Sequence, residues 1–121
     1  MLQRLVLAVT LAALLSSCSH SLPLTLDPNV PVKVLVRDGP RYTLEPTSPD
    51  YQKLALWVTR NRSGWALYVV TAPPIGVAVN CGSWSLNFLQ SSVLVTTPEG
   101  VFHKATRPDE YEFLRTHAPG T

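Results

Sequence analysis

The chain has 121 residues and a formal charge of +2, with 45% hydrophobic and 15% charged residues. Its length suits one small domain, and its composition excludes a chain that is disordered throughout. Outside Arg4, nine basic side chains stand against eight acidic ones. This balance excludes the basic surface of a typical nucleic-acid-binding domain, so we expect no nucleic-acid partner.

The first 17 residues have the features of a secretory signal. Arg4 supplies a positive charge, and residues 5–15 form an uncharged stretch of 11 residues. As a helix this stretch would rise about 16 Å, whereas the hydrocarbon core of a bilayer is about 30 Å thick. We therefore expect residues 1–17 to be a cleaved signal peptide and not a membrane-spanning helix.

The residues that close this signal are Leu15, Ser16, Ser17 and Cys18. An aliphatic residue, two small residues and a cysteine resemble the lipobox of bacterial lipoproteins. The resemblance implies cleavage before Cys18, diacylglycerol on its thiol and acylation of its new amine, so that Cys18 binds membrane lipid. Ser19 stands where an inner-membrane retention signal usually has Asp, which implies an outer-membrane lipoprotein with its domain in the periplasm.

The chain contains two cysteines, Cys18 and Cys81. An even number of cysteines in an exported protein ordinarily suggests a disulfide. Lipidation of Cys18 would leave Cys81 without a partner in the chain. The alternative is ordinary secretory cleavage at the same small residues, with Cys18 left as a thiol.

Residues 18–30 are expected to form the lipidated N-terminus and a flexible tether, followed by a single domain over residues 31–121. Three prolines occur between residues 19 and 31, and we find no helix or strand periodicity there. Fully extended, such a tether would reach about 40 Å and lift the domain clear of the headgroups. His20 is expected to be solvated within it.

A β-hairpin is predicted at the start of the domain. Valines alternate with other residues from 30 to 36, and a second strand follows Asp38 and Gly39. A two-residue Asp-Gly turn would mix apolar and polar side chains on each face, so we expect a three-residue turn or a bulge. This longer turn would place Val36 opposite Tyr42 and Arg37 opposite Arg41.

The predicted hairpin carries a stripe of basic side chains, Lys33, Arg37 and Arg41. We interpret this stripe as a solvated face, and the alternative is contact with anionic lipid or polymer.

A long helix is predicted to begin around residues 47–50, where a hydroxyl cap precedes Pro49 and Asp50. Its apolar residues recur at helical spacing. Gly64 is expected to end the helix, because glycine is favoured just beyond a helix C-terminus. A similar start at residues 106–109 predicts a short C-terminal helix. The apolar stripes are Tyr51, Leu54, Ala55, Trp57 and Val58 in the first helix, and Tyr111, Phe113 and Leu114 in the second.

Short strands separated by turn residues are predicted at 65–71, 77–81, 84–88, 93–97 and 101–105. Consecutive strands with brief turns favour an antiparallel meander. One long helix packed on its apolar face gives an α+β fold, with the short helix at the C-terminus.

No residue stands out as catalytic, and no cofactor or metal is expected. Cys81 shares the apolar phase of Val77 and Val79, which favours a buried thiol. A catalytic pair of Cys81 with His103 lacks any supporting motif. His103 and His117 are 14 residues apart without further ligands at metal-site spacing.

One candidate ligand-binding site is proposed on adjacency alone. Most aromatic side chains are expected to pack in the core, but Trp65 follows a helix end and begins a strand. With Arg60 and Arg62, it would offer an aromatic ring and two donors to a glycan or peptide.

These observations favour a membrane-anchored periplasmic lipoprotein with a non-enzymatic binding or accessory role towards an envelope protein or the cell wall. The alternative is an inhibitor or immunity lipoprotein that blocks an envelope enzyme. A third class, an envelope hydrolase, would need polar residues that converge in a cleft.

Overall fold

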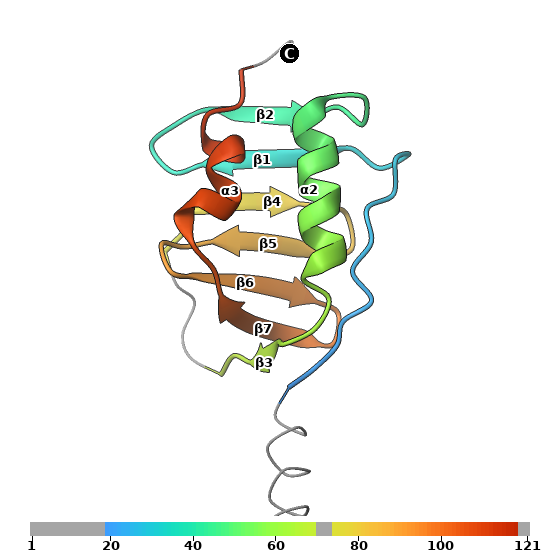
Figure 1. Cartoon of the computed structure of the whole chain (residues 1–121), viewed down its shortest axis with the longest axis vertical. Coiled ribbons are helices and arrows are strands. Elements are labelled where there is room, and N and C mark those ends of the chain that lie inside the picture. Colours follow the sequence, from blue (N-terminus) through green and yellow to red (C-terminus); the bar gives the residue numbers. More distant parts are fainter. Residues whose placement is uncertain (1–18, 70–73, 119–121) are drawn as a thin grey trace, which may run out of the picture.

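The structure, a computed structural model, describes residues 19–69 and 74–118. They form an antiparallel sheet with two helices on one of its faces (Figure 1), which confirms the predicted α+β class. The helices are α2 (Pro49–Arg60) and α3 (Pro108–Arg115). The strands are β1 (Val32–Val36), β2 (Arg41–Leu44), β3 (Ala66–Leu67), β4 (Val77–Asn80), β5 (Ser85–Phe88), β6 (Ser92–Thr97) and β7 (Gly100–Ala105). The predicted signal peptide and Cys18 lie outside the described residues.

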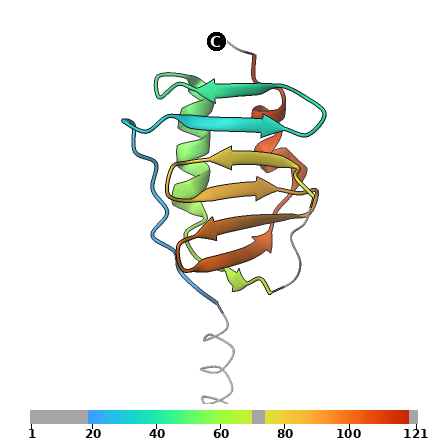
Figure 2. The ribbon, with the colours of Figure 1, turned by 180° about the vertical axis from the view of Figure 1, so that it is seen from behind.

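The sheet has seven strands in the order β2-β1-β4-β5-β6-β7-β3. The meander is confirmed for β4 to β7, and the β1–β2 hairpin joins it through β4. Helix α2 follows β2 at one edge and lies across the middle strands, and residues 61–65 continue from it to β3 at the other edge (Figure 1). No helix of the described residues lies over the opposite face of the sheet (Figure 2).

The register of the β1–β2 hairpin differs from the prediction by two residues. Val34, and not Val36, lies opposite Tyr42, and Leu35 lies opposite Arg41. The turn is displaced by one residue towards the N-terminus and comprises residues 37–39, because the Val36 N–H donates to the Pro40 carbonyl. Asp38 within this turn has a left-handed conformation with φ 55°, which aspartate tolerates better than most residues. The predicted apposition of Arg37 and Arg41 is therefore wrong, but the division of side chains between the two faces is unchanged.

The first helix begins as predicted and is shorter than the sequence pattern suggests. The Ser48 Oγ accepts a hydrogen bond of 3.1 Å from the backbone N–H of Tyr51, which caps the N-terminus. The helix has 12 residues and ends at Arg60. Gly64, with φ 81°, lies beyond that end and redirects the chain towards β3.

The core lies between the two helices and the sheet. Its largest fully buried side chains are Trp65, Phe88, Leu44, Leu54, Leu86 and Leu114. The Phe88 ring packs against Trp57 edge-on and against Tyr111 in a stacked arrangement, each with ring centroids 4.9 Å apart. These contacts fix both helices to the centre of the sheet.

The segment predicted to be a flexible tether packs on the domain. Leu24 is only 2% exposed and belongs to the core, with Leu22 and Leu26 packed against that core. His20 and Trp65 exchange backbone hydrogen bonds of 2.7 and 3.1 Å. The described part of this segment therefore does not behave as a free tether, and the domain begins well before residue 31.

Candidate functional site

The predicted aromatic site at Trp65 is wrong. The Trp65 side chain is 0% exposed, and its Nε1–H donates a hydrogen bond of 2.6 Å to the Asn61 carbonyl. The Lys104 Nζ lies 5.7 Å from the centre of its ring. The ring is thus part of the core and offers no surface to a glycan or peptide.

The two arginines of that predicted site do not converge with Trp65 on a ligand surface. The Arg62 Nε–H donates a hydrogen bond of 2.8 Å to the Leu24 carbonyl, which holds the N-terminal segment against the domain. Arg60 is an exposed side chain in the last turn of α2. Adjacency in sequence did not predict these positions, because the chain turns sharply between α2 and β3.

Cys81 is a buried free thiol, as predicted. It follows Val77 and Val79 on the face of β4 that the helices cover. Loss of solvent around the sulfur raises the pKa of Cys81 to about 12. The thiol is therefore protonated at neutral pH, which disfavours a role as a nucleophile.

His103 lies on the other face of the sheet. Its neighbour Phe102 points into the core, so His103 points away from it, and its ring meets Tyr68 edge-on with centroids 5.6 Å apart. The sheet thus separates His103 from Cys81. These two residues do not form the catalytic pair that was considered from the sequence.

A polar contact that the sequence did not predict joins the start of α2 to the C-terminal segment. The His117 Nδ1 lies 2.5 Å from Asp50 Oδ2, with the two side chains 5% and 18% exposed. The His117 ring stacks on Tyr42 with centroids 4.5 Å apart. Burial, and secondarily the negative charge of Asp50, raises the pKa of Tyr42. The start of α2 and the C-terminal segment, which this contact joins, both lie beside β2 at the top of Figure 1.

The uncovered face of the sheet carries a continuous row of side chains that runs across all seven strands. Directly paired residues in an antiparallel sheet point to the same side, so the register defines the row. Its members are Arg41, Leu35, Ala78, Asn87, Leu94, His103 and Ala66. A parallel row holds Thr43, Lys33, Asn80, Ser85, Thr96 and Val101.

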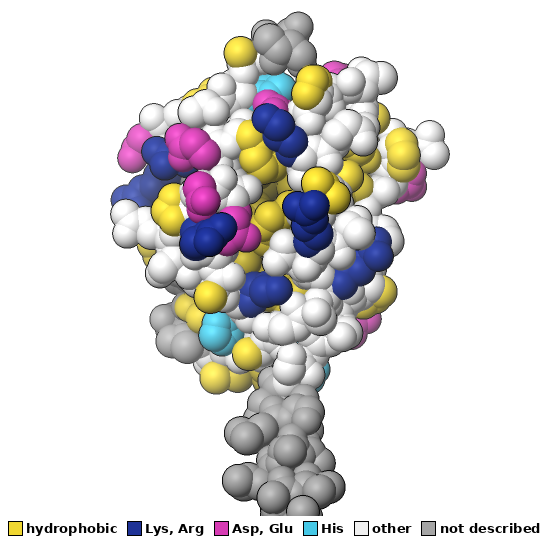
Figure 3. Space-filling model, in the orientation of Figure 1, with side chains coloured by type: hydrophobic (Ala, Val, Ile, Leu, Met, Phe, Trp, Pro, Cys, Tyr) yellow, Lys and Arg dark blue, Asp and Glu magenta, His cyan; other side chains and the backbone are white. Residues whose placement is uncertain are grey.

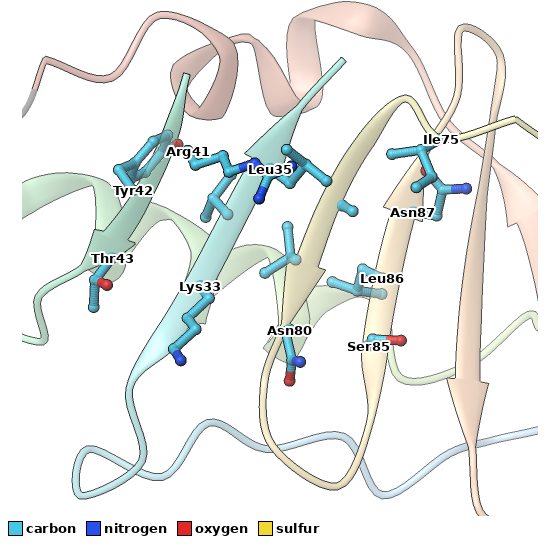
Figure 4. A pocket seen from close by; sticks show the side chains of 13 residues that line it. Lys33, Leu35, Arg41, Tyr42, Thr43, Ile75, Asn80, Ser85, Leu86 and Asn87 are labelled. Atoms are coloured by element: carbon cyan, nitrogen blue, oxygen red, sulfur yellow. The ribbon is translucent and has the colours of Figure 1, made fainter. Parts of the chain in front are cut away.

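A shallow hollow of about 650 Å³ lies on this face between β2 and β5 (Figure 4). We call it the open-face hollow. Its lining includes apolar side chains, two cations and several uncharged polar groups, without any Asp or Glu. The side chains that define it are Lys33, Leu35, Arg41, Thr43, Ile75, Ala78, Asn80, Ser85 and Asn87.

Asn87 shapes one side of the open-face hollow. Its Oδ1 accepts a hydrogen bond of 2.9 Å from the Gly76 N–H, and its Nδ2 donates one of 3.3 Å to the Pro74 carbonyl. A Cβ on Gly76 would lie 2.0 Å from the Phe88 carbonyl oxygen, so this close approach requires glycine. Ile75, which is 48% exposed, lines the hollow beside Asn87 (Figure 4).

The two cations of the open-face hollow have no ion-pair partner among the described residues. Four of the basic side chains in the described residues pair with carboxylates: Arg37, Lys53, Arg107 and Arg115. Within that part of the chain Arg60, Arg62 and Lys104 form no such pair either, but they lie outside the hollow. Lys33 and Arg41 take part in no such pair within residues 19–69 and 74–118. By contrast, the helix-covered face presents charges of both signs (Figure 3). The hollow therefore has a positive potential that the domain itself leaves unbalanced.

Two absences hold for the residues in the ranges 19–69 and 74–118. No helix among them is long and apolar enough to cross a membrane. No group of three or more His, Cys, Asp or Glu side chains among them could hold a metal ion.

The chain was compared with known protein families, curated proteins and solved structures, and none of them matched.

Proposed function

We propose that this chain is a lipid-anchored protein of the bacterial outer membrane, with its domain in the periplasm. The proposal rests on residues 1–19, in which an uncharged signal stretch leads directly to a lipobox-like sequence ending in Cys18. Two or three acyl chains on one residue would hold the protein stably, whereas one chain binds only marginally.

The proposed work of the domain is non-enzymatic binding of an envelope protein at the open-face hollow. The observation that carries this proposal is the uncovered sheet face with Lys33 and Arg41 unpaired in the hollow. Helices cover the other face, where Cys81 is buried as a protonated thiol. A binding role would use the exposed hollow and its two cations, Lys33 and Arg41.

The chemistry of the hollow favours a protein surface with an apolar side chain beside a carboxylate. Leu35, Ala78 and Ile75 supply the apolar contact. Arg41 lies on the edge strand β2 and Lys33 on its neighbour β1. Diagonal neighbours across two such strands are about 7–8 Å apart, close enough for both cations to approach one acidic group. Arg41 can meet a carboxylate with two parallel hydrogen bonds.

The first experiment is co-purification from detergent-solubilised envelopes with the acylated protein, with Cys18→Ala as the unanchored control. The affinity of the purified partner for the domain is then measured for the wild type and for K33E/R41E. We expect the double charge reversal to weaken binding at least about tenfold. The matched control is R107E, because Arg107 is exposed and lies at the start of α3 on the helix-covered face.

The results of this experiment distinguish an accessory binding role from an inhibitor or immunity role. Loss of affinity in K33E/R41E with R107E unchanged supports binding at the open-face hollow. Equal affinity of all three proteins contradicts it. If the partner is an enzyme that is bound in equal amounts and loses its activity, the inhibitor or immunity role replaces the accessory role.

A further inference from the structure

The N-terminal end of the described chain lies at one edge of the sheet. His20 pairs with Trp65 immediately before β3, which is the edge strand, so Ser19 lies beside that edge. One peptide bond joins Ser19 to Cys18, and consecutive Cα atoms are about 3.8 Å apart. Because residues 20–30 pack on the domain, no free tether remains between a lipid on Cys18 and this edge.

The same edge exposes the two most solvent-accessible large apolar side chains of the described residues. Leu67 is 54% exposed and Val69 is 83% exposed. Leu67 follows Trp65 by two residues, about 7 Å along the strand. An isolated exposed leucine needs no explanation, but two apolar side chains next to the anchor point favour contact with an interface.

The charges at this edge are compatible with a membrane surface. Neither β3 nor the adjoining β7 contains an acidic residue, and the nearest one in sequence is Glu99 in the turn before β7. The Lys104 Nζ donates a hydrogen bond of 2.9 Å to the Ser63 carbonyl beside the edge. Anionic headgroups attract such a cation, and no carboxylate of either strand repels them.

From these three observations we infer that the β3 edge, defined as Ser19, His20, Leu67 and Val69, rests directly on the phospholipid bilayer. The inference depends on the proposed lipid anchor at Cys18 and goes beyond it. The domain would then lie directly on the lipid headgroups and would not be held away from them by a long tether. The anchor supplies the membrane affinity, and the apolar edge fixes the orientation.

This orientation has a consequence for the open-face hollow. Strands stack about 4.8 Å apart, so the six spacings from β3 to β2 span about 29 Å. With β3 at the bilayer, the strands lie parallel to the membrane, and the hollow between β2 and β5 lies in the half of the domain farthest from it. A periplasmic partner would therefore meet the hollow without obstruction by lipid.

The test uses the full-length chain, expressed with its signal, purified in acylated form and reconstituted in vesicles of phosphatidylethanolamine and phosphatidylglycerol. In a Cys81→Ala background, Leu67→Cys and Val69→Cys each carry an environment-sensitive fluorophore. Leu56→Cys on α2 is the matched control, because Leu56 is 48% exposed and Leu67 is 54% exposed. Circular dichroism verifies that each labelled protein is folded.

We expect labels at positions 67 and 69 to shift their emission to shorter wavelength. Nitroxide lipids should quench them several-fold more than the label at position 56. Equal quenching at all three positions in protein whose Cys18 is shown by mass spectrometry to be acylated would overturn the inference and leave the anchor intact. An unacylated N-terminus would instead overturn the proposed anchor and this inference together.

Discussion

At the scale of single residues, burial decides which side chains can react. Cys81 follows two inward-facing valines, and its sulfur is surrounded by the core. This position was predictable from strand alternation alone. The raised pKa that follows from burial means that the protein exposes a nucleophilic thiolate at Cys81 only when it unfolds.

The reactivity of Cys81 tests this conclusion. In a Cys18→Ala variant, alkylation at pH 8 should be at least about 100-fold slower in the native protein than in denaturant, because a pKa near 12 leaves little thiolate. The native rate should keep rising with pH up to about 12, whereas the unfolded chain should level off above its ordinary pKa of 9.0. Equal rates at pH 8 would show that Cys81 is accessible and ionised.

Trp65 shows why aromatic adjacency to arginine is weak evidence for a site. The Trp65 ring, immediately before β3, lies under Lys104, which is distant in sequence, and its Nε1–H donates to the carbonyl of Asn61, the residue between the two arginines. Only the turn of the chain after α2 decides that the ring points inward.

Replacement of Trp65 by alanine should therefore act on stability. We expect Trp65→Ala to lower the free energy of unfolding by about 3–5 kcal/mol, measured by urea denaturation. Trp84→Ala is the comparison, since Trp84 is only partly buried against the core, and should cost less. A Trp65→Ala protein with wild-type stability would contradict the assignment of this ring to the core.

At the scale of elements, local signals predicted the starts of both helices better than their lengths. Ser48 caps α2 as expected, and Pro108 opens α3. For α3 the capping acceptor is the Glu110 carboxylate, which binds the Arg107 N–H at 2.8 Å. The contact of Asp50 with His117 was not predictable from local patterns, because the two residues are 67 positions apart in the sequence.

The Asp50–His117 contact should couple α2 to the C-terminal segment. A double-mutant cycle with Asp50→Ala and His117→Ala should give an interaction energy of about 0.5–3 kcal/mol, because both side chains are largely buried. The exposed Glu112–Arg115 pair serves as the control and should give about 0–1 kcal/mol. Additive effects of the two substitutions would mean that the contact contributes nothing to stability.

At the scale of the whole molecule, the sequence predicted the α+β class, most of the strands and the buried face. It missed the N-terminal segment because its prolines suggested a linker. Leu22, Leu24 and Leu26 in fact alternate with exposed Ser21, Pro23 and Thr25, so a period of two was present. The open-face hollow was also missed, apart from the basic stripe, because its walls come from four strands and a loop whose pairing no local pattern specifies.

The N-terminal segment should contribute to stability as part of the domain. Leu24→Ala should lower the free energy of unfolding by about 2–5 kcal/mol, since Leu24 is 2% exposed and belongs to the core. Pro23→Ala, at an exposed neighbouring position, should have little effect. If both variants unfold at the same denaturant concentration as the wild type, the segment is a free tether after all.

The most direct test of the central claim is mass spectrometry of the mature N-terminus of protein taken from the bacterial outer membrane. The account predicts a first peptide that begins at Cys18 and carries the added mass of diacylglycerol on the thiol and an acyl chain on the amine. A peptide with an unmodified Cys18, or one that still contains residues 1–17, would contradict it.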